Sequence, residues 1–232
     1  MTPSARLRDQ SGTTLVELMV GLMMGMVILS ALTMVVVVTM HGSARVSARV
    51  EATQNGRIVL ARITEELHSA CIYPKLAPIR KESTGTELRF VHAASGQGQA
   101  VAPTPVETRI KLSGGTLTRS DYAYASGSAP SWSFATTAGA TQQLMTQVAA
   151  ISPSTAIFRY YAYKNGGLEE LPASPLSEAE AARTIQVGIG IDVSPSPAQV
   201  ADQGADAVIQ DAAALRLTPP SFNENATASP CQ

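Results

Sequence analysis

The stretch SGTTLVELMVGLMMGMVILSALTMVVVVTM, residues 11–40, decides how the rest of the chain is organised. From Leu18 to Met40 it holds 23 residues without a formal charge. As a helix this run would extend about 35 Å at about 1.5 Å per residue, which exceeds the roughly 30 Å hydrocarbon core of a bilayer. Arg6 and Arg8 precede it, and the positive-inside bias places them in the cytoplasm. We therefore expect a single-pass inner-membrane protein with a cytoplasmic N-terminus and the remaining chain outside.

Two simpler kinds of segment share part of this pattern. A secretory signal peptide has a shorter apolar core of about 7 to 15 residues and a small-residue cleavage site. Here the run is longer, and no Ala-x-Ala site follows it before the polar helix that begins near Ser43. A plain membrane anchor would explain everything except Glu17. An ionisable group inside an apolar span costs a few kcal/mol unless it is paired. The position of Glu17 therefore predicts a functional role in which another group pairs with its carboxylate.

Gly12 followed by Thr13-Thr14-Leu15-Val16-Glu17-Leu18 resembles the N-terminal signal of type IV prepilins and type II secretion pseudopilins. The resemblance implies that residues 1–12 are a leader, which prepilin peptidase removes between Gly12 and Thr13 before methylating the new amine of Thr13. It also implies that the apolar helix of residues 13–41 stays on the mature protein and enters a filament core. There, Glu17 would neutralise the amine of a neighbouring subunit, a pairing that matters more in a low dielectric than on a surface.

The chain departs from the family pattern at two positions. The residue after the cleavage site is usually large and apolar, and here it is Thr13. Many major pilins carry proline at the position of Met34, so its absence predicts a helix without a proline kink and favours a minor pilin. Gly21 and Gly25 form a GxxxG motif, which can allow close packing of membrane helices, although glycine is also simply common in them.

The helical pattern continues beyond the apolar run, through residues 42–73, and Pro74 ends it. Spacings of three and four predict one buried stripe, made of Val46, Val50, Leu60, Ile63, Leu67 and Ala70. The opposite positions should be solvated, and they carry Arg45, Arg49, Glu51, Arg57, Arg62, Glu65 and Glu66. We therefore predict one continuous helix of roughly sixty residues, far longer than the usual globular helix of about 11 to 12.

From residue 74 to residue 232 the period becomes alternating, which predicts a β-rich head with an antiparallel sheet. The expected strands are residues 87–92, 106–112, 116–119, 157–163, 168 onward and 184–193, with hairpin turns at Ser113-Gly114-Gly115 and Lys164-Asn165-Gly166-Gly167. We expect loops or linkers at 93–105, 126–141 and 194–204, a strand or short helix at 207–217, and a loop-rich tail. The predicted fold class is α+β, with the helix against the sheet as in pilins.

Parts of this second region resemble a subset of the same family. QNGRIVLARITEELHSA, residues 54–70, is similar to the helix of PilW-like minor pilins and J-type pseudopilins, and residues 157–171 and 184–193 are similar to their head. The resemblance implies a minor pilin or pseudopilin with a periplasmic or extracellular head. Its partners would be other pilins through the N-terminal helix, prepilin peptidase, membrane lipid before assembly and the inner-membrane assembly platform. A single-pass anchored binding or sensor domain that never polymerises is the alternative.

No residue pattern predicts chemistry on a substrate, so we expect neither enzymatic activity nor a cofactor. The formal net charge of -1 does not suggest a nucleic-acid partner. His41, His68 and His92 share no metal-ligand spacing with each other or with the two cysteines, so we expect no metal site. Cys71 and Cys231 could form a disulfide in an oxidising compartment, or remain two free thiols. The resemblance favours the disulfide, because this family often staples its C-terminal region.

Overall fold

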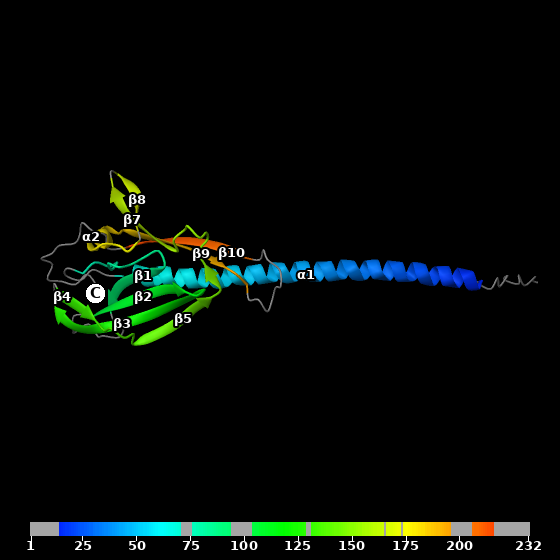
Figure 1. Ribbon diagram of the computed structural model, residues 1–232, viewed down its shortest axis with the longest axis horizontal. Coiled ribbons are helices and arrows are strands. Elements are labelled where there is room, and N and C mark those ends of the chain that lie inside the picture. Colours follow the sequence, from blue (N-terminus) through cyan, green and yellow to red (C-terminus); the bar gives the residue numbers. More distant parts are fainter. Residues whose placement is uncertain are drawn as a thin grey trace, which may run out of the picture. The chain divides into compact units, whose positions relative to one another are not determined.

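A computed structural model describes residues 14–70, 76–93, 104–128, 131–164, 166–172, 174–195 and 206–215 (Figure 1). The chain divides into two units, Met1–Val46 and Ser47–Gln232, and each is described by itself. Helix α1 runs from Leu15–His68, 54 residues, and contributes to both units. It ends six residues before Pro74, where Ser69 N donates to the carbonyl oxygens of Glu65 and Glu66. The prediction of one long helix is confirmed, with its C-terminal end a few residues earlier.

The described residues of the second unit form two antiparallel sheets of five strands each, where the sequence predicted one sheet. The first sheet has the order β1-β2-β3-β4, and β5 pairs with β3. Its strands are β1 (Glu87–Ala93), β2 (Pro105–Ser113), β3 (Thr116–Ser128), β4 (Ser131–Phe134) and β5 (Ala140–Thr146). The hairpin between β2 and β3 turns at Gly114 and Gly115, whose φ angles of 56° and 74° suit glycine.

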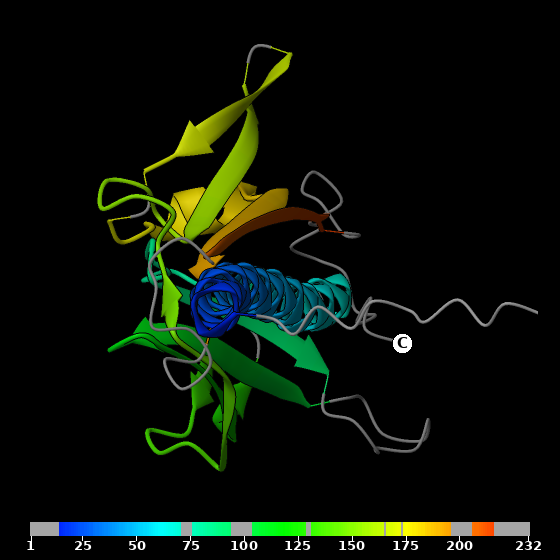
Figure 2. The same ribbon diagram turned by 90° about the vertical axis from the view of Figure 1, so that its right-hand side faces the viewer.

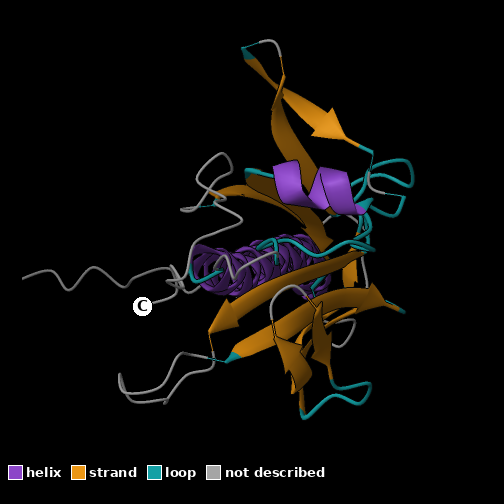
Figure 3. Cartoon of the chain, turned by 90° about the vertical axis from the view of Figure 1, so that its left-hand side faces the viewer, coloured by secondary structure: helices purple, strands orange, loops and turns teal. Residues whose placement is uncertain are grey.

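The second sheet has the order β10-β9-β7-β8, and the two-residue strand β6 pairs with β9. Its strands are β6 (Val148–Ala149), β7 (Phe158–Lys164), β8 (Gly167–Leu171), β9 (Gln186–Val193) and β10 (Ala207–Ala214). A short helix, α2 (Glu178–Arg183), lies between β8 and β9 in the chain (Figure 3). Ser177 and Glu180 form a capping box at its start, because each side chain accepts a hydrogen bond from the other's backbone N–H.

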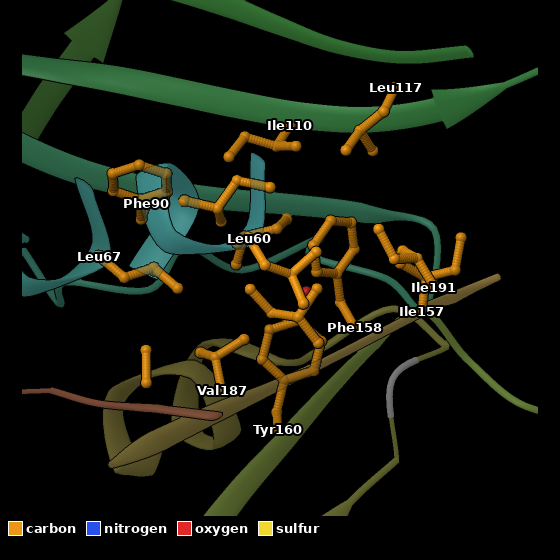
Figure 4. Packing of buried hydrophobic residues seen from close by; sticks show 14 of the residues in the cluster. Leu60, Leu67, Phe90, Ile110, Leu117, Ile157, Phe158, Tyr160, Val187 and Ile191 are labelled. Carbon is orange, nitrogen blue, oxygen red and sulfur yellow. The ribbon is translucent and has the colours of Figure 1, made fainter. Parts of the chain in front are cut away.

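Within the second unit, α1 lies between the two sheets, as the view along the helix in Figure 2 shows. Leu60, Ile63 and Leu67 of α1 are at most 2% exposed and belong to one apolar cluster with side chains of both sheets. Figure 4 shows Leu60 and Leu67 among Phe90 and Ile110 of the first sheet and Tyr160 and Val187 of the second. Burying each such side chain contributes about 1.5–3 kcal/mol, so this part of α1 forms the centre of the head's core.

The predicted buried stripe of α1 is only partly correct. Leu60, Ile63, Leu67 and Ala70 are buried, but Val46 and Val50 are 64% and 49% exposed. In this part of the helix the buried residues are small, namely Ala48, Ala52 and Gly56. They are small because the strands come very close, with Ile209 of β10 and Val193 of β9 against the Cα of Gly56. The larger Val50, in the second unit, is left exposed.

Other predictions for the head have mixed outcomes. The β1 strand, the β2–β3 and β7–β8 hairpins and the β9 strand are confirmed, and residues 207–214 form a strand rather than a helix. The prediction of a loop at residues 126–141 is wrong, because β3 continues to Ser128 and strands β4 and β5 follow it. These strands are rich in Ser, Thr, Ala and Gln and mostly exposed, so they lack the apolar alternation that identifies a half-buried strand. The loops predicted at 93–105 and 194–204 lie largely outside the described residues.

Candidate functional site

The first turn of α1 places Glu17 three residues after Thr14, which directly precedes the helix. Thr14 Oγ1 accepts a hydrogen bond from the backbone N–H of Glu17 at 3.4 Å, and Thr14 O accepts one from Leu18 N at 3.2 Å. This is the N-cap arrangement expected of a threonine before a helix. A carboxylate in the first turn is also stabilised by the positive end of the helix dipole. Both effects orient Glu17 at the N-terminal end of the apolar helix.

Glu17 differs from every other polar side chain in the described part of the apolar run, Leu15 to Met40. The hydroxyls of Ser30, Thr33 and Thr39 donate to carbonyl oxygens three or four residues earlier at 2.8–3.0 Å. These hydroxyls are therefore satisfied within their own helix and need no partner from outside. Among the described residues, by contrast, the carboxylate of Glu17 has no hydrogen bond or ion pair. Glu17 thus carries the one formal charge of this run, and no described residue pairs with it.

Glu17, Gly21 and Gly25 follow one another at intervals of four, which places all three on one face of α1. A β-carbon built on either glycine meets nothing within 4 Å. The backbone on this face is therefore open to the approach of another chain, directly beside the carboxylate.

The apolar side chains around this face are exposed in the first unit. The large hydrophobic residues from Leu15 to Met40 are between 44% and 75% exposed. One helix among the described residues, α1, is long and apolar enough to cross a membrane. An apolar surface that extends along the helix from Leu15 to Met40 does not remain in water. Either lipid or protein must therefore cover it.

The other predicted site residues, Gly12, Thr13, Cys71 and Cys231, lie outside the described residues. His41 is exposed on α1, His68 lies near the end of that helix, and His92 lies at the end of β1, where its Nε2 is 3.0 Å from Thr108 Oγ1. Across the described ranges, no group of three or more His, Cys, Asp or Glu side chains could hold a metal ion.

A polar network links α1 to the first sheet, and the sequence reasoning missed it. Arg119 of β3 donates to Glu66 of α1 through Nε at 2.8 Å and to Asp121 through Nη1 at 2.8 Å. Asp121 Oδ1 accepts a hydrogen bond from Thr108 of β2 at 2.7 Å. Glu66 was predicted to be solvated, but its side chain is only 21% exposed and it is paired with Arg119. Leu117, Arg119 and Asp121 occupy every second position of β3 and therefore share one face of the strand. This spacing was the signal available in the sequence.

Tyr160 places a phenol inside the apolar core of the second sheet. Its hydroxyl donates to the carbonyl oxygen of Thr84 at 3.0 Å. Burial raises the pKa of this phenol far above its ordinary value, because the ionised form would lose its hydration. The hydroxyl is enclosed by the core and opens to no cleft, so its role is to connect β7 to the segment before β1.

No family model matches this chain, and no curated protein matches it.

Proposed function

We propose that this chain is a minor pilin or pseudopilin, a structural subunit of a type IV pilus or a type II secretion pseudopilus. The observation that carries the proposal is Glu17, a carboxylate without a partner among the described residues, in the first turn of an apolar helix and five residues after Gly12. The resemblance of residues 12–18 to a prepilin signal explains both features. Prepilin peptidase cleaves after Gly12 and methylates Thr13, and the new amine supplies the missing cation.

The exposed apolar surface of α1 supports the same proposal. Before assembly, lipid covers the residues from Leu15 to Met40, with the N-terminus in the cytoplasm and the head in the periplasm. During assembly, helices of neighbouring subunits replace the lipid. Because lipid tails are as apolar as these side chains, hydrophobic burial alone gives little reason for helices to associate there. A buried ion pair between Glu17 and the amine of a neighbour sets which subunits pack and in which register, a role known for buried polar groups in other helical assemblies.

The open face at Gly21 and Gly25 fits this role. Small residues let helix backbones approach closely, so that packing contacts accumulate along the helices. The glycines follow Glu17 on one face of α1, so a neighbouring helix that approaches them lies near the carboxylate. The subunit works by packing and charge pairing, and no step of this role requires catalysis or a cofactor. The inner-membrane assembly platform is the partner that moves it from lipid into the filament.

The test is the Glu17→Gln variant, which removes the charge and keeps the shape of the side chain. We expect leader removal and membrane insertion to be unchanged. Incorporation into filaments sheared from cells should fall at least about tenfold, which corresponds to about 1.4 kcal/mol. Glu65→Gln is the matched control, because Glu65 is an exposed acid of the same helix within the second unit. Equal incorporation of both variants would remove the role assigned to Glu17, and absence of the wild-type chain from every filament fraction would favour the anchored, non-polymerising domain.

A further inference from the structure

The first turn of α1 carries a sequence motif that also starts α2. Thr14-Leu15-Val16-Glu17 and Ser177-Glu178-Ala179-Glu180 each have a hydroxyl residue followed three positions later by glutamate. At α2 this motif forms a complete capping box. Glu180 N donates to Ser177 Oγ at 3.3 Å, and Ser177 N donates to Glu180 Oε2 at 2.9 Å. The box at α2 is therefore a reference, within the same chain, for the start of α1.

The start of α1 has the first half of this box in nearly the same geometry. Glu17 N donates to Thr14 Oγ1 at 3.4 Å, against 3.3 Å for the matching bond in α2. Because α1 begins at Leu15, Glu17 is its third residue, just as Glu180 is the third residue of α2. The second half would be a hydrogen bond from Thr14 N to the carboxylate of Glu17, and it is open in this structure. Since the backbone is already capped, rotation of the Glu17 side chain is enough to close the box.

The surroundings of Glu17 decide whether the open or the closed box is favoured. An α-helix leaves its first N–H groups without a partner inside the helix. In water, solvent satisfies both such a donor and an exposed carboxylate. In a bilayer core water is missing, and every unsatisfied polar group is costly. Closing the box lets Thr14 N and the Glu17 carboxylate satisfy each other, in a hydrogen bond that the negative charge strengthens.

The box at α2 shows what closure does to a carboxylate. Hydrogen bonds from the side chain and from the backbone N–H of Ser177 lower the pKa of Glu180. The pKa falls because both bonds stabilise the ionised form. A closed box thus holds a glutamate in the charged form that can later attract a cation.

We propose that Glu17 closes a capping box with Thr14 while the apolar part of α1 lies in lipid, and that the box opens when the amine of a neighbouring subunit reaches the carboxylate. The carboxylate then exchanges a backbone donor for a full positive charge, so it has a partner before and after assembly. Thr14 is a positioning residue, because its hydroxyl holds the first turn in both states. The inference rests on the proposed function, since the neighbour's amine arrives only when a filament assembles.

NMR of the full chain, leader included, in lipid nanodiscs tests the closed box. The leader keeps the nitrogen of Thr13 in a peptide bond, so no N-terminal amine competes for the carboxylate. A hydrogen bond to the carboxylate moves the amide proton signal of Thr14 downfield. We expect Glu17→Ala to move this signal upfield, about as far as Glu180→Ala moves the signal of Ser177. The Ser177 signal is the control, because its hydrogen bond to Glu180 is present in the structure.

Glu17→Gln separates the box from the charge. Glutamine also closes a capping box, so this variant should leave most of the downfield shift of Thr14 in place. An unmoved Thr14 signal in Glu17→Ala would overturn the inference. An equal upfield move in both Glu17 variants would also overturn it, because the shift would then report the charge alone. Either result leaves the proposed function standing, since the ion pair in a filament does not require the box.

A double substitution tests whether Thr14 acts through Glu17. Thr14→Val keeps the shape of the side chain but removes the hydroxyl, and it should lower the share of processed chains found in sheared filaments several-fold. Thr14→Ser should keep that share, because serine caps a helix at least as well as threonine. Thr39→Val is the matched control, since the hydroxyl of Thr39 donates to carbonyl oxygens of its own helix.

In the Glu17→Gln background, Thr14→Val should add no further loss, because a neutral side chain has no ion pair to lose. An equal loss in both backgrounds would show that Thr14 acts without Glu17, and the inference would fail. Absence of the wild-type chain from every filament fraction would overturn the proposed function and this inference with it.

Discussion

Gly56 of α1 packs against Ile209 of β10, whose terminal methyl occupies the space that a β-carbon on Gly56 would take. A β-carbon on Gly56 would overlap Ile209 Cδ1 and lie 3.3 Å from Val193 Cγ2. This contact fixes the distance between the helix and the second sheet at the N-terminal end of the head. It also explains why small residues form the buried stripe there in place of the predicted valines.

Substitution of Gly56 by leucine should destabilise the head by about 1–3 kcal/mol, the usual cost of overpacking. Gly56→Ala should cost less, because the terminal methyl of Ile209 can move and alanine favours the helix by about 1 kcal/mol. Chemical unfolding in detergent, followed by the fluorescence of Trp132, measures both. Gly42→Leu is the control, since a β-carbon on Gly42 meets nothing within 4 Å. Equal stability of Gly56→Leu and wild type would show that β10 does not lie where the structure places it.

Arg119→Met removes the ion pair that joins β3 to Glu66 of α1 and the ion pair with Asp121 on β3 itself. Their side chains are 19–24% exposed, so solvent screens the charges only in part. We expect the free energy of unfolding to fall by about 1–3 kcal/mol, because the carboxylate of Asp121 loses its cation and that of Glu66 keeps only the more exposed Arg62. Lys164→Met breaks the Lys164–Glu169 pair, which is 60% and 48% exposed, and should cost only about 0–1 kcal/mol. Similar losses for the two variants would contradict a central role for the Arg119 network.

Tyr160 should make the head sensitive to alkaline pH. In the unfolded chain its phenol ionises near the ordinary pKa of 10.0, whereas burial raises the pKa in the folded state. Below about pH 10 the phenol is neutral in both states, and its contribution to stability is complete. As the pH rises above 10, only the unfolded state loses the proton, so stability falls. Unfolding measured from pH 8 to 11 should therefore show a shallower decline for Tyr160→Phe, and equal slopes would mean that the phenol is not buried.

Local patterns in the sequence predicted much of the fold. The uncharged run and the spacing of Leu60, Ile63 and Leu67 predicted the helix and its core contacts, and paired glycines predicted two hairpins. The same patterns could not predict that the strands form two sheets on opposite sides of α1, because periodicity does not report which strands pair. Nor could they predict β4 and β5, whose small and polar side chains bury little. Helix α2 had a usable signal, since Ser177 and Glu180 have capping-box spacing.

The candidate site was more predictable than the interactions of the head. Glu17 and the glycines are defined by intervals along one helix, and a helix preserves such intervals in space. The pairing of Glu66 with Arg119 depends on a contact between residues more than fifty positions apart, and no local pattern contains it.

The central claim, that the apolar helix is a processed subunit of a filament, is tested most directly at the N-terminus. Filaments sheared from cells can be digested, and the N-terminal peptide of this chain identified by mass spectrometry. The account predicts a peptide that begins at Thr13, carries one added methyl group on its amine and is absent from cells without prepilin peptidase. A chain that still begins at Met1, in cells that process their other prepilins, would contradict the account.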